Sequence, residues 1–187
     1  MRNFWLFLWE TIKIAAVTLA IVIPVRYFLF QPFFVKGASM EPSFQDGQYL
    51  IIDELSYRLR EPQRGEVVIF RYPLDPKQFY IKRLIGLPGE TVEINDGWVK
   101  IYNQDNPEGF ILDESSYLTR EAMTYGDAKT VLGEDDYFVL GDNRESSFDS
   151  RRWGILPENN IVGRALLRAW PPQDADWLIS PQYSFSQ

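Results

Sequence analysis

The sequence predicts a mostly β domain that contains a small inserted subdomain and is preceded by one N-terminal transmembrane helix. An apolar run near the N-terminus is about as long as a bilayer is thick. After residue 44, short runs rich in β-branched and aromatic residues alternate with turn signals. Residues 103–135 interrupt that alternation with a polar, turn-rich stretch. The length of 187 residues suits one globular domain with an appendage.

The first element is the apolar run over residues 4–25, which reaches the ~20 residues that a spanning helix needs. We expect residues 1–30 to form a membrane anchor. Arg2 and Lys13 favour a cytoplasmic N-terminus, because positive charges tend to stay on the cytoplasmic side. A cleavable signal peptide is one alternative, although residues 26–35 are bulky where a small-residue cleavage site should lie. A buried core helix is the other.

The later elements are strands bounded by turn signals. Asp46-Gly47 and Arg64-Gly65 each precede a β-rich run. The turn Asn95-Asp96-Gly97 separates two short alternating runs and predicts a hairpin. A brief helix is expected over residues 53–60. In chain order, the predicted strands are residues 48–52, 66–72, 78–87, 91–94, 98–102, 136–141 and 161–170.

These elements divide the chain into three parts. The anchor of residues 1–30 is followed by a β-rich domain of residues 31–170, with the insertion at about residues 103–135. Residues 171–187 form a C-terminal tail.

Composition excludes several kinds of chemistry. The chain contains no Cys and no His, so it has no disulfide, no thiol nucleophile, no Ser-His-Asp triad and no Cys/His zinc site. If the protein is an enzyme, its base must be Lys, Asp, Glu or Tyr. The formal net charge is −7, and residues 1–34 carry +2, so residues 35–187 carry −9. An acidic domain argues against nucleic acid as a partner.

A candidate nucleophile is Ser39, which follows two small residues in the segment Gly37-Ala38-Ser39-Met40-Glu41-Pro42. Small residues leave the backbone open to a substrate that approaches closely, and Pro42 stiffens the chain that follows. Serines in loops that contain glycine and proline are common, so an ordinary turn is the alternative for this segment taken alone.

A candidate base is Lys82, which shares a strand face with Tyr80 and Leu84. Burial among apolar neighbours favours the neutral amine and lowers the pKa of a lysine. A neutral amine can take the proton from a serine hydroxyl, which is a weak nucleophile by itself. The alternative is an edge-strand lysine that reaches into solvent, since Arg83 beside it shows that this strand carries charge.

Residues 141–154 form a third candidate element, a polar loop after a hydrophobic strand. It is dense in hydrogen-bonding groups and is suited to support a site. A solvated turn with a surface Asp–Arg pair is the alternative, and such a pair would contribute little to stability.

Together these segments resemble the type I signal peptidases, membrane-bound Ser–Lys proteases of the leader peptidase family. The resemblance covers about residues 12–170. The matching stretches are Ser39 to Phe44, Arg64 to Phe70, Lys82 to Glu90 and Gly141 to Gly154. The first stretch is shared with self-cleaving repressors of the SOS type, whereas the last two are specific to signal peptidases.

The resemblance implies a role for each matching residue. Ser39 would be the nucleophile of a serine endopeptidase and Lys82 its base. Ser147 would orient the lysine amine, and Asp149 and Arg151 would form an ion pair that holds the site. Small pockets for Ala at positions −1 and −3 of the substrate would be lined by Phe33, Val35, Met40, Phe44, Tyr80 and Ile81.

The sequence departs from some relatives next to the nucleophile. Some members have a serine that helps to bind the oxyanion where this chain has Gly37. Backbone N–H groups, including that of Ser39, must then bind the oxyanion. Lys36 stands where other members often have Pro or Glu, and this difference would alter the depth of the pocket.

The implied partners are the signal peptides of exported preproteins and the lipid bilayer, with no nucleic acid, no metal and no cofactor. The implied location is the plasma (inner) membrane of a bacterium. A single pass would leave the N-terminus cytoplasmic and the catalytic domain outside the cytoplasm.

The sequence is compatible with two other functions. One is a Ser–Lys protease that cleaves itself or a regulator, although no DNA-binding helical domain precedes Ser39. The other is a catalytically silent, membrane-tethered β-domain used for binding, which the presence of both Ser39 and Lys82 disfavours.

Overall fold

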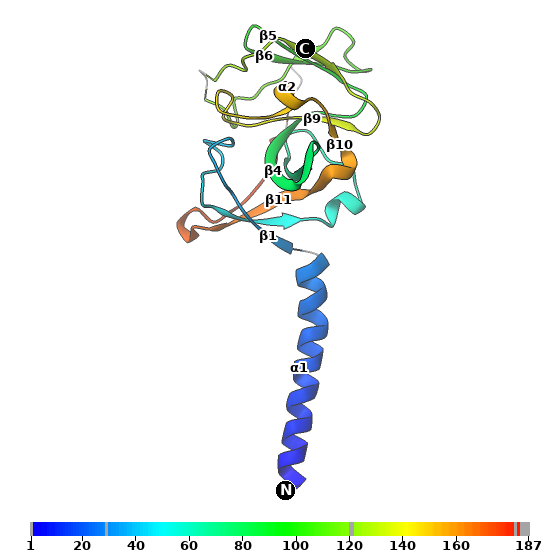
Figure 1. Ribbon diagram of the computed structural model, residues 1–187, viewed down its shortest axis with the longest axis vertical. Coiled ribbons are helices and arrows are strands. Elements are labelled where there is room, and N and C mark those ends of the chain that lie inside the picture. The colour runs from blue at the N-terminus through cyan, green and yellow to red at the C-terminus, as the bar shows by residue number, and fades with distance from the viewer. Residues whose placement is uncertain (1, 29, 120–121, 182, 184–187) are drawn as a thin grey trace.

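The computed structural model describes residues 2–28, 30–119, 122–181 and 183. One long helix leads into a β-domain made of two antiparallel sheets (Figure 1). The predicted mostly β class is therefore confirmed.

Helix α1 (Arg2–Phe28) extends away from the β-domain (Figure 1). Its side chains at residues 4–20 and 22 are exposed, including large apolar ones such as Trp5 and Phe7. Within the predicted anchor, the side chains of residues 1–3, 21 and 23–30 lie outside the description. Among the described residues, no helix combines the length and the hydropathy needed to cross a membrane. The helix is confirmed, and the membrane crossing stays a prediction.

The larger sheet carries the strands on either side of the candidate site. Its order is β1-β2-β11-β3-β4-β9-β10, and β12 pairs with β11. Every pairing is antiparallel. The strands are β1 (Phe30–Phe34), β2 (Tyr49–Asp53), β3 (Val67–Tyr72), β4 (Asp75–Gly86), β9 (Asp136–Leu140), β10 (Leu156–Pro157), β11 (Ile161–Trp170) and β12 (Asp176–Trp177).

The smaller sheet has the order β7-β6-β5-β8 and spans residues 91–131, so it includes two strands that precede the predicted insertion of residues 103–135. Its centre is the predicted hairpin of β5 (Thr91–Asn95) and β6 (Trp98–Tyr102), in which Asn95 pairs with Trp98. The two central turn residues, Asp96 and Gly97, both have positive φ, as the favoured two-residue hairpin turn requires. β7 (Phe110–Ile111) and β8 (Ala128–Val131) come from residues 103–135, where the sequence predicts no strand.

Short helical segments complete the β-domain. The expected helix over residues 53–60 is a single 3-10 turn, η1 (Ser56–Arg58), and the Asp53 carboxylate accepts hydrogen bonds from the N–H groups of Leu55 and Ser56. The remaining ones are α2 (Ser150–Trp153), η2 (Glu158–Asn160) and η3 (Pro172–Asp174). Within the predicted tail, β12 pairs with β11 and Leu178 packs against the core.

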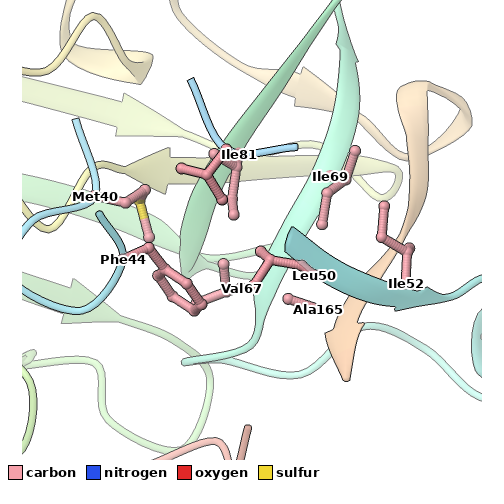
Figure 2. Packing of buried hydrophobic residues seen from close by; sticks show 9 residues of the cluster. Met40, Phe44, Leu50, Ile52, Val67, Ile69, Ile81 and Ala165 are labelled. Carbon is pink, nitrogen blue, oxygen red and sulfur yellow. The ribbon is translucent and has the colours of Figure 1, made fainter. Parts of the chain in front are cut away.

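One buried cluster of the core anchors the segment that carries Ser39. Met40 and Phe44 are buried with Val67 and Ile81, and Figure 2 shows them projecting from their segment into this cluster. Burying two large apolar side chains on one side of a short loop holds the loop in place, since each contributes about 1.5–3 kcal/mol. The loop therefore keeps Ser39 at the surface of the cluster.

Candidate active site

The segment with Ser39 is the connection between β1 and β2. The backbone closes it at its base, because Val35 N–H donates to Gln48 O at 2.8 Å and Gly47 N–H donates to Val35 O at 3.0 Å. Gly37 has φ +88, a conformation that side chains disfavour, and its N–H donates to Asp46 Oδ1 at 2.6 Å. Ser39 itself is half-buried.

Lys82 reaches this serine from the middle of β4. Its Nζ lies 2.8 Å from Ser39 Oγ and donates to Ile81 O at 2.8 Å. The predicted strand face is confirmed, because Tyr80 and Leu84 belong to one core cluster and the Tyr80 ring lies 5.6 Å from Nζ. Only 4% of Lys82 is exposed.

Burial changes the protonation of this amine. Loss of hydration lowers the pKa of Lys82 to about 8, and the carboxylates of Asp149 and Asp142 act in the opposite direction. With that pKa, roughly a tenth of the amine is neutral at pH 7. A neutral amine can accept a proton from the Ser39 hydroxyl across the 2.8 Å contact, so the pair is suited to general base catalysis.

The loop of residues 141–154 is bonded directly to the serine segment. Asn143 N–H donates to Ser39 O at 3.1 Å, and Asn143 Nδ2 donates to Ala38 O at 3.1 Å. Gly141 is needed beside these bonds, because a Cβ there would overlap the Ser39 carbonyl oxygen and Ser147 Oγ. The position of Ser39 thus depends on this loop.

Asp149 and Arg151 form the predicted ion pair at the base of the loop. Arg151 Nε and Nη2 each donate at 2.8 Å to one oxygen of Asp149. Burial alone would raise the pKa of Asp149, but the bonds from Arg151 and from Gly141 N–H lower it below its usual value. Asp149 is therefore an anion next to the site.

Ser147 does not bond to Lys82 in this structure. Its hydroxyl is buried close to the Asp149 carboxylate and helps to lower the pKa of that group. It lies beside Gly141, on the same side of the loop as the Ser39 carbonyl.

A cavity of about 530 Å³ opens in front of the pair of Ser39 and Lys82. Of the six predicted pocket residues, Phe33, Tyr80 and Ile81 line it. The other three, Val35, Met40 and Phe44, are not among the lining residues; they are buried in the core cluster behind Ser39. The remaining lining residues are Phe34, Lys36, Gly37, Ala38, Phe79, Ser146 and Phe148.

Comparison with known proteins places this arrangement in a family. The family model described as "Signal peptidase, peptidase S26" matches residues 8–170. The chain belongs to the peptidase S26 family.

Curated relatives of this S26 peptidase are named as signal peptidases. "Probable signal peptidase I-2" of Synechocystis sp. is 43% identical over 176 residues, which cover 91% of this chain and 75% of that protein. "Signal peptidase I" of Bacillus amyloliquefaciens is 34% identical over 89% of this chain and 87% of that protein. The crystal structure of a signal peptidase I from Enterococcus faecalis V583 aligns with a TM-score of 0.45 and 32% identity, over 56% of this chain and 97% of that chain, so this likeness is partial.

The S26 peptidase has a second set of buried charges that the sequence reasoning missed. Arg83, next to Lys82, donates through Nε and Nη2 to Asp142 at 2.8 and 2.6 Å. Arg144 in the same loop pairs with Glu114 at 2.6 Å. Two features of the sequence indicate these pairs. Lys82 and Arg83 are adjacent cations inside one apolar strand, and Asp142 and Arg144 follow a second apolar strand. These pairs brace the loop that holds Ser39.

Proposed function

We propose that this S26 peptidase removes N-terminal signal peptides from exported preproteins, using Ser39 as nucleophile and Lys82 as general base. The observation that carries the proposal is the 2.8 Å contact between Ser39 Oγ and a lysine amine that burial makes easy to deprotonate. In a chain without His or Cys, this is the nucleophile and base pair that the candidate site offers.

The reaction is acyl transfer in two halves. Ser39 Oγ attacks the carbonyl carbon of the substrate's −1 residue while neutral Lys82 takes the hydroxyl proton, and backbone N–H groups, including that of Ser39, stabilise the oxyanion. Lys82 then gives the proton to the leaving amine, and the mature protein departs. In the second half, Lys82 takes a proton from water, the hydroxide attacks the ester, and the proton returns to Ser39 Oγ as the signal peptide leaves. No step calls for a cofactor.

An extended substrate fits between two strand edges at the cavity. β1 is the end strand of its sheet, and β4 pairs with β9 only from Arg83 onward, so residues 79–81 lack a ladder partner on that side among the described residues. Unpaired edges can accept an extended peptide as an added strand.

The proposed preference for small residues at −1 and −3 follows from what lines and backs this cavity. Alternate side chains of an extended peptide point the same way, so −1 and −3 face one wall. Phe33, Tyr80 and Ile81 line the cavity, and Val35 and Met40 are packed behind it and keep it shallow.

The loop residues have supporting roles in this proposal. Asp149 and Arg151 hold the loop whose Asn143 fixes the Ser39 segment. The proposed role of the buried Ser147 hydroxyl is to form a hydrogen bond with the Lys82 amine. Such a bond would orient the lone pair of the amine toward Ser39.

We further propose that residues 1–30 anchor the peptidase domain of residues 31–170 to the plasma membrane of a bacterium. Support comes from the 27-residue length of α1 and from its exposed aromatic and aliphatic side chains. A single crossing with the N-terminus in the cytoplasm would place Ser39 close to the outer lipid surface. The signal peptide is itself held in the bilayer there, which gives proximity without tight binding.

Purified full-length protein in detergent, incubated with a preprotein, tests the proposal. Ser39→Ala and Lys82→Ala should each lower kcat by at least about 10³-fold, because the two groups act as a unit. Ser116→Ala, which alters an exposed serine outside the site, should leave the rate unchanged. Mass spectrometry of the product should place the cut after a small residue at −1.

Turnover by a folded Ser39→Ala protein would refute the assignment of the nucleophile. A folded wild-type protein that binds the preprotein without cutting it would favour the tethered binding domain instead.

A further inference from the structure

One charged side chain at the mouth of the cavity has no role in the mechanism. Lys36 is exposed and lines the cavity together with Ser39. Among the described residues, its amine makes no hydrogen bond and no ion pair. Lys82 lies deep behind the serine, whereas Lys36 stands where a substrate side chain would enter.

The backbone shows which way Lys36 points. Val35 is buried, and both its N–H and its C=O bond to the neighbouring segment at Gln48 and Gly47. Because successive residues of an extended chain point to opposite sides, Lys36 faces away from the core. Its backbone groups face the open edge, away from β2.

A peptide added at that edge would present its residues in a defined alternation. Residues that lie opposite each other on paired strands share a face. We place the −1 and −3 side chains on the face that Phe33 shares with Val35, because Phe33 is a lining residue of the proposed pockets. The −2 and −4 side chains then lie on the face of Lys36.

The charged residues that line the cavity are both cationic. They are Lys36 and Lys82, and no acidic residue lines the cavity. Asp46 bonds to the N–H of Gly37 but is not one of the lining residues. Since the whole chain carries a net charge of −7, the mouth of the cavity is a local cationic spot on an acidic protein.

We infer that Lys36 is a specificity-determining residue, which favours substrates with an acidic side chain at −2 or −4. This inference rests on the proposed function. The pair would form at an exposed rim, so the gain in kcat/KM should be about two- to fivefold and should decline with added salt. It should appear in KM, because the ion pair forms in the bound substrate and in the transition state alike.

Peptides that differ only by Glu, Gln or Lys at −2, at −4 or at +2 test the inference, in an uncharged detergent at low ionic strength. For each enzyme, rates are divided by the rate for the Gln peptide, which removes any change in basal activity. Wild-type enzyme should prefer Glu over Gln over Lys at −2 or −4 and show no order at +2. Lys36→Glu should invert the order, and Lys36→Arg should keep it.

Lys77→Glu is the matched control, since it makes the same charge change at an exposed position of β4 that does not line the cavity. It should retain the wild-type order. The inference is overturned if Lys36→Glu keeps the wild-type order, or if Lys77→Glu inverts it as fully as Lys36→Glu does. Failure of every enzyme to cut the Gln peptides would instead refute the proposed function.

Discussion

The two faces of strand β4 carry adjacent cations that are buried to the same extent and differ in their partners. Lys82 is 4% exposed and contacts a hydroxyl and a carbonyl oxygen. Arg83, on the other face, is 5% exposed and forms a two-point ion pair with Asp142. Burial lowers the pKa of Lys82, whereas burial of Arg83 is outweighed by its bonds to Asp142, which raise the pKa.

The comparison shows that the partner, more than the depth of burial, decides whether a buried cation is a structural or a reactive group. A paired guanidinium keeps its proton and braces the fold. An amine without a directly bonded carboxylate is held at a cost to stability and gives up its proton readily. The same strand therefore serves the fold on one face and the chemistry on the other.

The largest expected effect comes from removing Arg83, the cation on the structural face of β4. Arg83→Met leaves Asp142 buried without its partner, so the free energy of unfolding should fall by about 3–5 kcal/mol. Urea denaturation at pH 7 measures this. Lys129→Met removes an exposed pair with Glu93 and should cost less than about 1 kcal/mol. Equal losses in the two variants would contradict the structural role of Arg83.

The matched substitution on the face of β4 that carries Lys82 should raise stability instead of lowering it. Lys82→Met removes a buried amine whose pKa falls from 10.5 to about 8 on folding, so the variant should be more stable at pH 7 by about 1–3 kcal/mol. Loss of the bonds to Ser39 and Ile81 offsets part of the gain.

The pH dependence of the stability difference between Lys82→Met and the wild type identifies the cause of that difference. Below pH 8 the amine is protonated in both states, and the folded protein bears the full penalty. Between pH 8 and 10.5 only the unfolded state keeps the proton, so wild-type stability rises and the advantage of Lys82→Met disappears. Denaturation of both proteins at pH 7 and pH 10.5 measures this, and an advantage that does not change with pH would show that the lysine is not desolvated.

The smallest effect is on the pH profile of cleavage. Because neutral Lys82 is the proposed base, kcat/KM should rise through one ionisation near pH 8, by about tenfold between pH 7 and pH 9. Lys82→Arg should be inactive throughout, since a guanidinium keeps its proton in this range. A midpoint near 10.4, the value of a solvated lysine, would mean that the amine is exposed during turnover.

Local patterns were sufficient to predict most of the fold. The hairpin around Asp96-Gly97 and the long β-rich runs were found because each has a strong alternation and a defined turn. β7 and β8 were missed, since two residues of one and the polar AKTV of the other take their strand form from their neighbours in the sheet.

The site was predictable to a lesser depth. The contact of Ser39 with Lys82 could be predicted, because each residue lies in a motif that the sequence analysis identified. The ion pair of Arg83 with Asp142 and the burial of Met40 behind the cavity depend on which sides of two loops face each other. The sequence marks these residues, but which of them meet is decided by long-range packing.

The open edges of β1 and of residues 79–81 have a consequence for the protein in concentrated solution. An edge that can accept one extended chain can accept another, so two copies could join strand to strand. The net charge of −7 opposes such self-association, because like-charged copies repel each other. At 0.1 M salt, repulsion between charges more than about 10 Å apart is largely screened. Colloidal stability should therefore be greatest at low ionic strength.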